Sequence, residues 1–207
     1  LAAVGCGLRC RFCYRPGNLN AAAGNEADPV ALARGIDAAA DCRHVHWLGG
    51  DPDESLPGIL TVHRLVRIDR PLVWNTHSYL TPAQARLLEG VVDGFVADLK
   101  FGPGACGERL AGIKGYWPAA TATLGRLAAF NSRLLLRHVL LPGHLECCAR
   151  PVVDWLLQQP WLAAAAARVL VQYEPLGARG ELGRHLSAEE EAAASLLNAR
   201  LAERTGW

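Results

Sequence analysis

Three cysteines stand close together near the start of the chain, at Cys6, Cys10 and Cys13 in the stretch GCGLRCRFCY. Thiolates at this spacing can bind a metal, and the number of other ligands decides which one. A structural zinc site takes four protein ligands, commonly as two separated pairs, whereas this loop supplies three. The candidates for a fourth ligand elsewhere in the chain are His44, His46, Cys42 or a more distant residue.

An iron–sulfur cluster is the second possible use of these thiolates, because a cluster held by three cysteines leaves one iron open for a substrate. A disulfide scaffold is disfavoured. The chain has seven cysteines, which is an odd number, and it is longer than the usual small secreted domain. We therefore expect a reducing, cytoplasmic compartment.

The composition is that of a folded chain that depends on a hydrophobic core. Its 207 residues are 51% hydrophobic and 20% charged, which predicts one domain over residues 1–207. Lys+Arg is 21 and Asp+Glu is 20, so bulk charge gives no reason to expect nucleic acid or a membrane as a partner. The most apolar stretch, residues 161–171, is shorter than the roughly 20 residues of a membrane span. Since the chain starts at Leu1 and contains no methionine, we expect it to be truncated just before the first strand.

Six short apolar runs alternate with stretches of helical period, which is typical of repeated βα units. The predicted strands are residues 1–5, 44–48, 71–75, 94–100, 133–141 and 168–173. Helix starts are predicted at Asp28 and Thr81, each followed by proline, and at a capping box of Ser187 and Glu190. Six units are too few for a closed eight-stranded barrel. The pattern leaves two architectures, an open partial barrel or a flat doubly wound sheet.

Polar residues cluster at the carboxyl ends of the predicted strands, where both architectures place their functional groups. They are Cys6 to Cys13, Gly49 to Asp51, Asn75 and Thr76, Asp98 and Lys100, and Glu174. Lys100 is one of only two lysines against nineteen arginines, which favours a specific role over a surface salt bridge. Arg137 lies within an apolar strand and is costly to bury without an anion, either a ligand or a structural carboxylate.

The cysteine loop resembles the signature of the radical S-adenosylmethionine (SAM) enzymes. In that family three cysteines at C-x3-C-x2-C spacing hold a 4Fe-4S cluster, and an aromatic residue precedes the last one, as Phe12 precedes Cys13 here. The stretch LGGDP resembles the family's glycine-rich motif, although it is also a plausible tight turn. The resemblance implies that Gly49 and Gly50 allow a close approach, and that Asp51 or a neighbouring carbonyl accepts from the ammonium of SAM.

Further blocks resemble one branch of the family, the PflX-type homologues of pyruvate formate-lyase activating enzyme. Among them are FCYRPGN, PLVWNTHSYL and LLRHVLLPGHLECC. The resemblance implies a partial (βα)6 barrel of the triosephosphate-isomerase type, with helices outside a parallel sheet. It also implies cofactor contacts from polar residues at later strand ends, namely Asn75, Thr76, Asp98, Lys100 and Arg137.

The chemistry implied is reductive cleavage of SAM to a 5′-deoxyadenosyl radical that abstracts hydrogen. The implied partners are an electron donor, such as flavodoxin or ferredoxin, and a glycyl-radical enzyme to be activated. Activators often carry histidine where Glu174 stands, so a small molecule or a peptide is an alternative substrate. A zinc-stabilised binding protein without catalytic activity is the alternative from a different class.

The remaining cysteines form no second closely spaced motif, so no auxiliary iron–sulfur domain is predicted. Cys147 and Cys148 are adjacent and suit either thiol chemistry or an ordinary helix start. His138 and His144 are better placed for a functional role than the other histidines, because they lie at or just after a predicted strand.

Overall fold

The six strands form one parallel sheet whose spatial order is the order of the sequence. The computed structural model describes residues 1–20, 24–130 and 133–205. The strands are β1 (Ala2–Ala3), β2 (Val45–Gly49), β3 (Leu72–Thr76), β4 (Gly94–Asp98), β5 (Arg133–Val139) and β6 (Ala166–Leu170). The helices are α1 (Pro29–Ala38), α2 (Leu56–Leu65), α3 (Pro82–Leu88), α4 (Cys106–Ala111), α5 (Tyr116–Ala129), α6 (Arg150–Leu157) and α7 (Ala188–Thr205).

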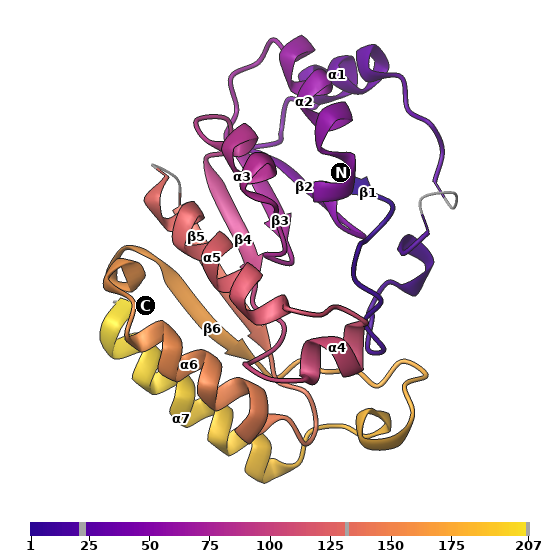
Figure 1. Cartoon of the computed structure of the whole chain (residues 1–207). Coiled ribbons are helices and arrows are strands. Elements are labelled where there is room, and N and C mark those ends of the chain that lie inside the picture. Colours follow the sequence, from indigo (N-terminus) through magenta and orange to yellow (C-terminus); the bar gives the residue numbers. More distant parts are fainter. Residues whose placement is uncertain (21–23, 131–132, 206–207) are drawn as a thin grey trace.

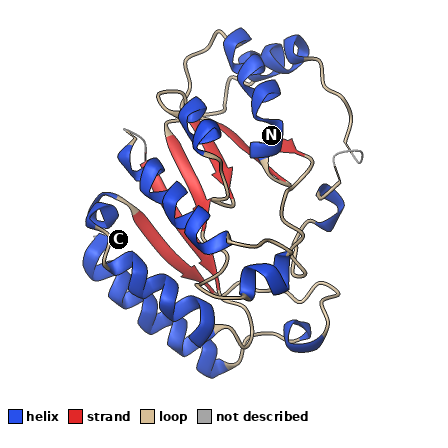
Figure 2. Ribbon diagram, viewed as in Figure 1, coloured by secondary structure: helices blue, strands red, loops and turns tan. Residues whose placement is uncertain are grey.

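This strand order decides between the two predicted architectures. A doubly wound sheet reverses its strand order at a switch point, and β1 to β6 never reverse. Parallel neighbours joined by crossovers of one hand wind the chain in one direction, so the sheet curves as a partial barrel. The strands form one curved layer, and α6 and α7 lie side by side along β6 (Figures 1 and 2). The predicted partial (βα)6 barrel is confirmed.

The predicted helix starts are confirmed by hydrogen bonds. The Asp28 carboxylate accepts from the first backbone N–H groups of α1. Thr81 and Gln84 form a capping box at the start of α3. At α7 the Ser187 Oγ accepts from Glu190 N at 3.2 Å, and the Glu190 carboxylate accepts from Ser187 N at 2.8 Å. These side chains satisfy N–H groups that helices leave unpaired.

Four strands end earlier than predicted, for local reasons. The first strand pairs only at Ala2 and Ala3, because Gly5 takes a φ of +94° and donates to the Asn18 carbonyl instead of to a neighbouring strand. The fourth ends at Asp98 instead of residue 100, and Lys100 N donates to the Tyr116 hydroxyl instead of to a neighbouring strand. The fifth and sixth strands end together, since Val139 is the last residue of β5 and its partner is Leu170. The segments that follow these early strand ends therefore form the loops at the carboxyl edge of the sheet.

The core fills the space between the sheet and its helices. Strand residues of alternate position point into it, among them Trp74, Phe95 and Leu136, each at most 1% exposed. Burying one such side chain contributes roughly 1.5–3 kcal/mol. Among the described residues, no helix is both long and apolar enough to cross a membrane.

Candidate active site

The cysteine loop leaves the carboxyl end of β1 and is held in place by α4. Arg9 N donates to the Ala111 carbonyl at 3.1 Å, and Arg11 N donates to the Leu110 carbonyl at 2.8 Å. These carbonyls belong to the last turn of α4, where a helix leaves its acceptors unpaired. Figure 1 shows the loop descending from β1 to the end of this helix. Backbone bonds therefore position the three cysteines, independently of any metal.

All three thiols of the loop are partly buried and free of disulfides. Burial raises the pKa of Cys10 to about 12, and the nearby Lys100 ammonium opposes that rise. Only a deprotonated thiol binds a metal, so Cys10 needs a strong cation to become a ligand. Among the described residues, the three sulfurs do not form a group with all members within 4.8 Å of one another. One zinc ion would require such closeness, whereas the separate irons of a cluster do not.

A cationic network lies at the ends of β3, β4 and β5. One carboxylate oxygen of Asp98 accepts from the Lys100 ammonium at 2.9 Å, and the other accepts from the Arg137 Nε at 2.7 Å. Arg137 also donates to the Asn75 side-chain oxygen at 2.8 Å. Burial would raise the pKa of Asp98, but the two cations outweigh it and lower that pKa. Two positive charges face one negative charge, which leaves this part of the site attractive to an anion.

The backbone explains why glycines precede Asp51. A Cβ on Gly49 would lie 2.1 Å from the Ala3 carbonyl oxygen, and the φ of Gly49 is +131°. A Cβ on Gly50 would lie 2.2 Å from the Gly5 carbonyl oxygen. Asp51 N also donates to Gly5 at 2.7 Å. The close approach expected at these glycines is therefore made by the root of the cysteine loop.

The Asp51 side chain is buried and fully engaged. Its carboxylate accepts from Asp53 N at 3.0 Å and lies 2.6 Å from the His77 Nε2. Burial would raise the pKa of Asp51, but His77 outweighs it and the pKa is lowered. The Cys6 sulfur lies within 4.8 Å of both side chains, so the first cysteine rests against this ion pair. The role of Asp51 toward the SAM ammonium stays a prediction, with neighbouring carbonyls as the other candidate acceptors.

Comparison with known proteins identifies the family. Residues 2–156 match the family model of the radical SAM superfamily, which is most of the chain. This chain is a member of the radical SAM superfamily. Members of this superfamily use a 4Fe-4S cluster and SAM, so these are the cofactors of this chain.

The relatives are longer than this radical SAM chain. It is 34% identical to the uncharacterized protein MJ0674 of Methanocaldococcus jannaschii over 149 residues, which are 72% of this chain and 43% of that protein. The structure of Streptococcus suis SuiB bound to the precursor peptide SuiA has a TM-score of 0.67 at 15% identity, over 98% of this chain and 45% of SuiB. A radical SAM methyltransferase from Sphaerobacter thermophilus has a TM-score of 0.58 at 16% identity, over 96% and 62%. The chain thus spans less than two thirds of each of these proteins.

Asn75 and Thr76, both predicted to contact the cofactor, have different partners in this radical SAM site. The Thr76 hydroxyl is fully buried and donates to the Asp53 carboxylate at 2.6 Å. The other oxygen of Asp53 accepts from the Trp74 indole at 2.6 Å. Burial and the neighbouring Asp51 charge raise the pKa of Asp53 well above its usual value. A cofactor contact from Thr76 stays a prediction, whereas Asn75 already touches the cationic network through Arg137.

Tyr116 is a site residue that the sequence analysis missed. Its buried hydroxyl donates to the His77 carbonyl at 2.9 Å, lies 3.2 Å from the Asp98 carbonyl and accepts from Lys100 N at 2.9 Å. Its ring packs edge-on against Phe101 with centroids 5.1 Å apart, and Phe101 packs in the same way against Phe12 at 5.8 Å. A row of three packed aromatic rings thus connects the cysteine loop to the ends of β3 and β4.

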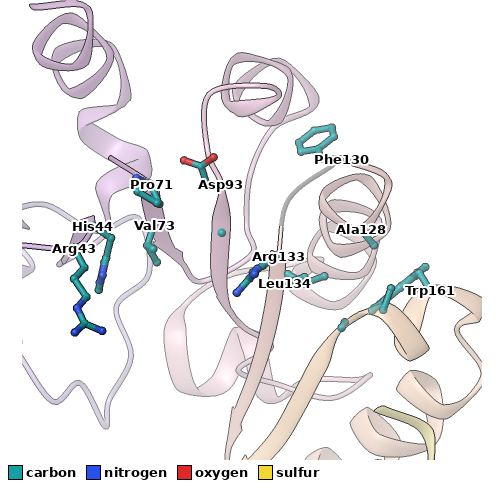
Figure 3. A pocket seen from close by; sticks show the side chains of 13 residues that line it. Arg43, His44, Pro71, Val73, Asp93, Ala128, Phe130, Arg133, Leu134 and Trp161 are labelled. Atoms are coloured by element: carbon teal, nitrogen blue, oxygen red, sulfur yellow. The ribbon is translucent and has the colours of Figure 1, made fainter. Parts of the chain in front are cut away.

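A large pocket lies at the opposite end of the sheet (Figure 3). It is open, has a volume of about 800 Å³ and is lined by residues at the amino ends of strands, such as Pro71, Asp93, Gly94 and Arg133. None of the predicted cluster or cofactor residues lines it. Since barrel enzymes carry their chemistry at the carboxyl ends of the strands, we place the active site at the cysteine loop and not in this pocket.

Proposed function

We propose that this chain is the radical SAM core of an enzyme that cleaves SAM reductively. Cys6, Cys10 and Cys13 would hold the 4Fe-4S cluster. When bound, the reduced cluster supplies the electron that cleaves the sulfonium and gives the 5′-deoxyadenosyl radical. The observation that carries the proposal is the place of the cysteine loop, next to a network with an excess of positive charge at the same end of the sheet.

The residues around the loop have separate roles in this proposal. Lys100 and Arg137 would attract the carboxylate of SAM, because Asp98 neutralises only one of their two charges. Asn75 would orient Arg137, and Thr76 would support the end of β3 through its buried hydrogen bond to Asp53. The root of the cysteine loop packs on Gly49 and Gly50, so these glycines would fix the cluster relative to Asp51. Phe12 would shield the last cysteine from water by its contact with Phe101.

We further propose membership of the PflX-type branch, with a glycine of a partner enzyme as the site of hydrogen abstraction. The ordered sequence blocks support this, including QYEP just after the last strand. Glu174 of this block is exposed, with its carboxylate 3.9 Å from the His185 ring, so it is available to a partner. A peptide or small-molecule substrate is the alternative. A flavodoxin or ferredoxin would supply the electron, in a reducing cytoplasm that suits seven free cysteines.

Product analysis tests the proposed cleavage. The reconstituted chain, reduced with dithionite in the absence of oxygen, should release 5′-deoxyadenosine and methionine from SAM. Cys10→Ala should release neither, and the exposed Cys42→Ala should match the parent chain. Iron content measured on the same samples separates an empty loop from an inactive cluster. A parent chain that binds zinc but no iron in the loop, or that binds the cluster and releases no 5′-deoxyadenosine, would refute the proposal.

Partner activation is tested separately. The proposal predicts that a glycyl-radical enzyme is encoded beside the gene, and that enzyme serves as the partner in the assay. The partner should show a glycyl radical by paramagnetic resonance only when the reduced chain and SAM are both present. A deuterated glycine in the partner should transfer deuterium to 5′-deoxyadenosine. Deoxyadenosine formed without deuterium or a glycyl radical would direct the search to peptides and small molecules.

A further inference from the structure

A second group of metal-binding side chains lies outside the cysteine loop. Cys106 begins α4, and His144, Cys147 and Cys148 follow β5 in the chain. One ligand atom from each of the four lies within 4.8 Å of every other. The sequence predicts no second cluster motif, because 38 residues separate Cys106 from His144. The fold brings these four side chains together although they are far apart in the sequence.

The distances within this group fit a single tetrahedral ion. Bond lengths of about 2.3 Å to sulfur and about 2.0–2.1 Å to nitrogen give tetrahedral edges of roughly 3.8 Å between two sulfurs and roughly 3.6 Å between nitrogen and sulfur. The Cys106 sulfur lies 3.6 Å from the Cys147 sulfur and 3.6 Å from the His144 Nδ1. The Cys147 sulfur lies 3.9 Å from the Cys148 sulfur and 3.2 Å from the His144 Nδ1.

The outer nitrogen of His144 is also placed as in a metal site. His144 is 1% exposed, and its Nε2 makes no hydrogen bond among the described residues. That nitrogen lies 3.5 Å from a Glu181 carboxylate oxygen, and a carboxylate in this position orients a metal-bound histidine. Glu181 also pairs with Arg109, whose guanidinium lies 3.8 Å from the Cys106 sulfur. Arg109 would offset the negative charge of three thiolates around a divalent ion.

The backbone is shaped to present the two adjacent cysteines together. Residues Leu145–Ala149 form one π-helical turn, in which the N–H of Ala149 donates to the His144 carbonyl at 3.2 Å. Such turns are rare and occur often at functional sites. Gly102, on the segment after β4, touches this turn so closely that a Cβ there would lie 2.5 Å from the Cys147 carbonyl oxygen. The turn that carries Cys147 and Cys148 is therefore packed against the segment that leads to Cys106.

We propose that Cys106, His144, Cys147 and Cys148 bind one zinc ion in a closed, structural site. Three thiolates and one imidazole are a common zinc ligand set, and four protein ligands leave no open position for a substrate. The ion would join the start of α4 to the turn after β5. Because the other end of α4 carries the backbone bonds to Arg9 and Arg11, this zinc would brace the cysteine loop.

Metal analysis of the purified chain tests the site. The parent chain, expressed with zinc and kept without oxygen, should hold one zinc ion, and Cys106→Ser and His144→Asn should hold none. Cys42→Ser is the matched control and should keep the zinc. Glu181→Gln should bind zinc roughly 10- to 100-fold more weakly, because it loses the group that orients His144. Cys10→Ala should keep the zinc and lose the iron, so a failure of this inference is distinguishable from a failure of the proposed cleavage.

Two further measurements protect the test against misfolded variants. Cobalt added to the zinc-free parent chain should give the visible bands of a tetrahedral thiolate site. Iron that remains in Cys10→Ala, together with a zinc-free parent, would show a second iron site and overturn the assignment. A parent chain without zinc whose Cys106 and Cys147 form a disulfide by mass spectrometry would overturn it as well.

Discussion

Replacing Tyr116 with phenylalanine removes a single hydroxyl from the point where the ends of β3 and β4 are joined. The hydroxyl donates to the His77 carbonyl and accepts from Lys100 N, both at 2.9 Å, and it is buried. The ring stays, so its edge-on contact with Phe101 is unchanged. The substitution therefore tests the hydrogen bonds alone, without a cavity.

The expected loss follows from the groups left behind. Phenylalanine leaves the Lys100 N–H and one carbonyl of this buried region without their hydroxyl partner, and each unsatisfied buried group costs about 1–3 kcal/mol. We expect a loss of about 3 kcal/mol in the free energy of unfolding. For a domain of this size, that corresponds to a melting temperature lower by about 6–12 °C. Lys100 loses an anchor at the same time, so SAM binding should weaken as well.

Thermal unfolding followed by circular dichroism measures the effect, with Tyr79→Phe as the matched control. The Tyr79 hydroxyl lies 3.5 Å from the Lys114 carbonyl in an exposed position, so its loss should change the stability by about 0.5 kcal/mol or less. If Tyr116→Phe melts within 2 °C, roughly the shift of 0.5–1 kcal/mol, of both the parent and this control, the reasoning is wrong. Such a result would mean that water replaces the hydroxyl at this point.

Three further outcomes follow from the same contacts. Gly50→Ala should displace the cysteine loop and lower the amount of iron bound on reconstitution, because the new Cβ would meet the Gly5 carbonyl. Gly58→Ala is the control: a Cβ there would have no neighbouring atom within 4 Å, so this variant should bind iron normally. Hydrogen bonds from Arg184 and two backbone N–H groups lower the pKa of Glu190 to about 2. The stabilisation from Glu190 is therefore present above about pH 4.5 and is lost as the pH falls toward 2. Glu190→Gln should weaken the dependence of the melting temperature on pH in this range, and Glu189→Gln, at an exposed position, should leave it unchanged. Lys100→Met should weaken SAM binding measured by equilibrium dialysis by at least about tenfold, the equivalent of 1.4 kcal/mol, and a Lys100→Arg variant that binds no better than Lys100→Met would contradict a role for the charge.

The sequence was sufficient for features that depend on neighbours along the chain. The helix caps at Asp28, Thr81 and Ser187 are local hydrogen bonds, and each is present. Apolar runs in the sequence predict the strands, and a parallel sheet brings the polar carboxyl ends of these strands to one edge. The resemblance to the radical SAM family, and not the strand pattern, predicts that Asp98 and Arg137, which stand 39 residues apart, belong to one site, and their side chains are hydrogen-bonded.

Other features depend on contacts that no local pattern encodes. Tyr116 begins a helix and looks like a core residue, yet its hydroxyl reaches a carbonyl 39 residues away. Asp53 directly follows the stretch LGGDP, and only the fold shows that it is buried against Trp74 and Thr76. The group around Cys106 and His144 escapes spacing arguments because its members come from different βα units.

Paramagnetic resonance of the reduced, reconstituted chain with and without SAM tests the central claim most directly. A cluster held by Cys6, Cys10 and Cys13 has one open iron, so SAM should shift the signal of the reduced cluster, and Cys10→Ala should show no such signal. A cluster signal that SAM leaves unchanged would mean that no iron is open to the cofactor. That result, or a signal of equal intensity in Cys10→Ala, would contradict the account.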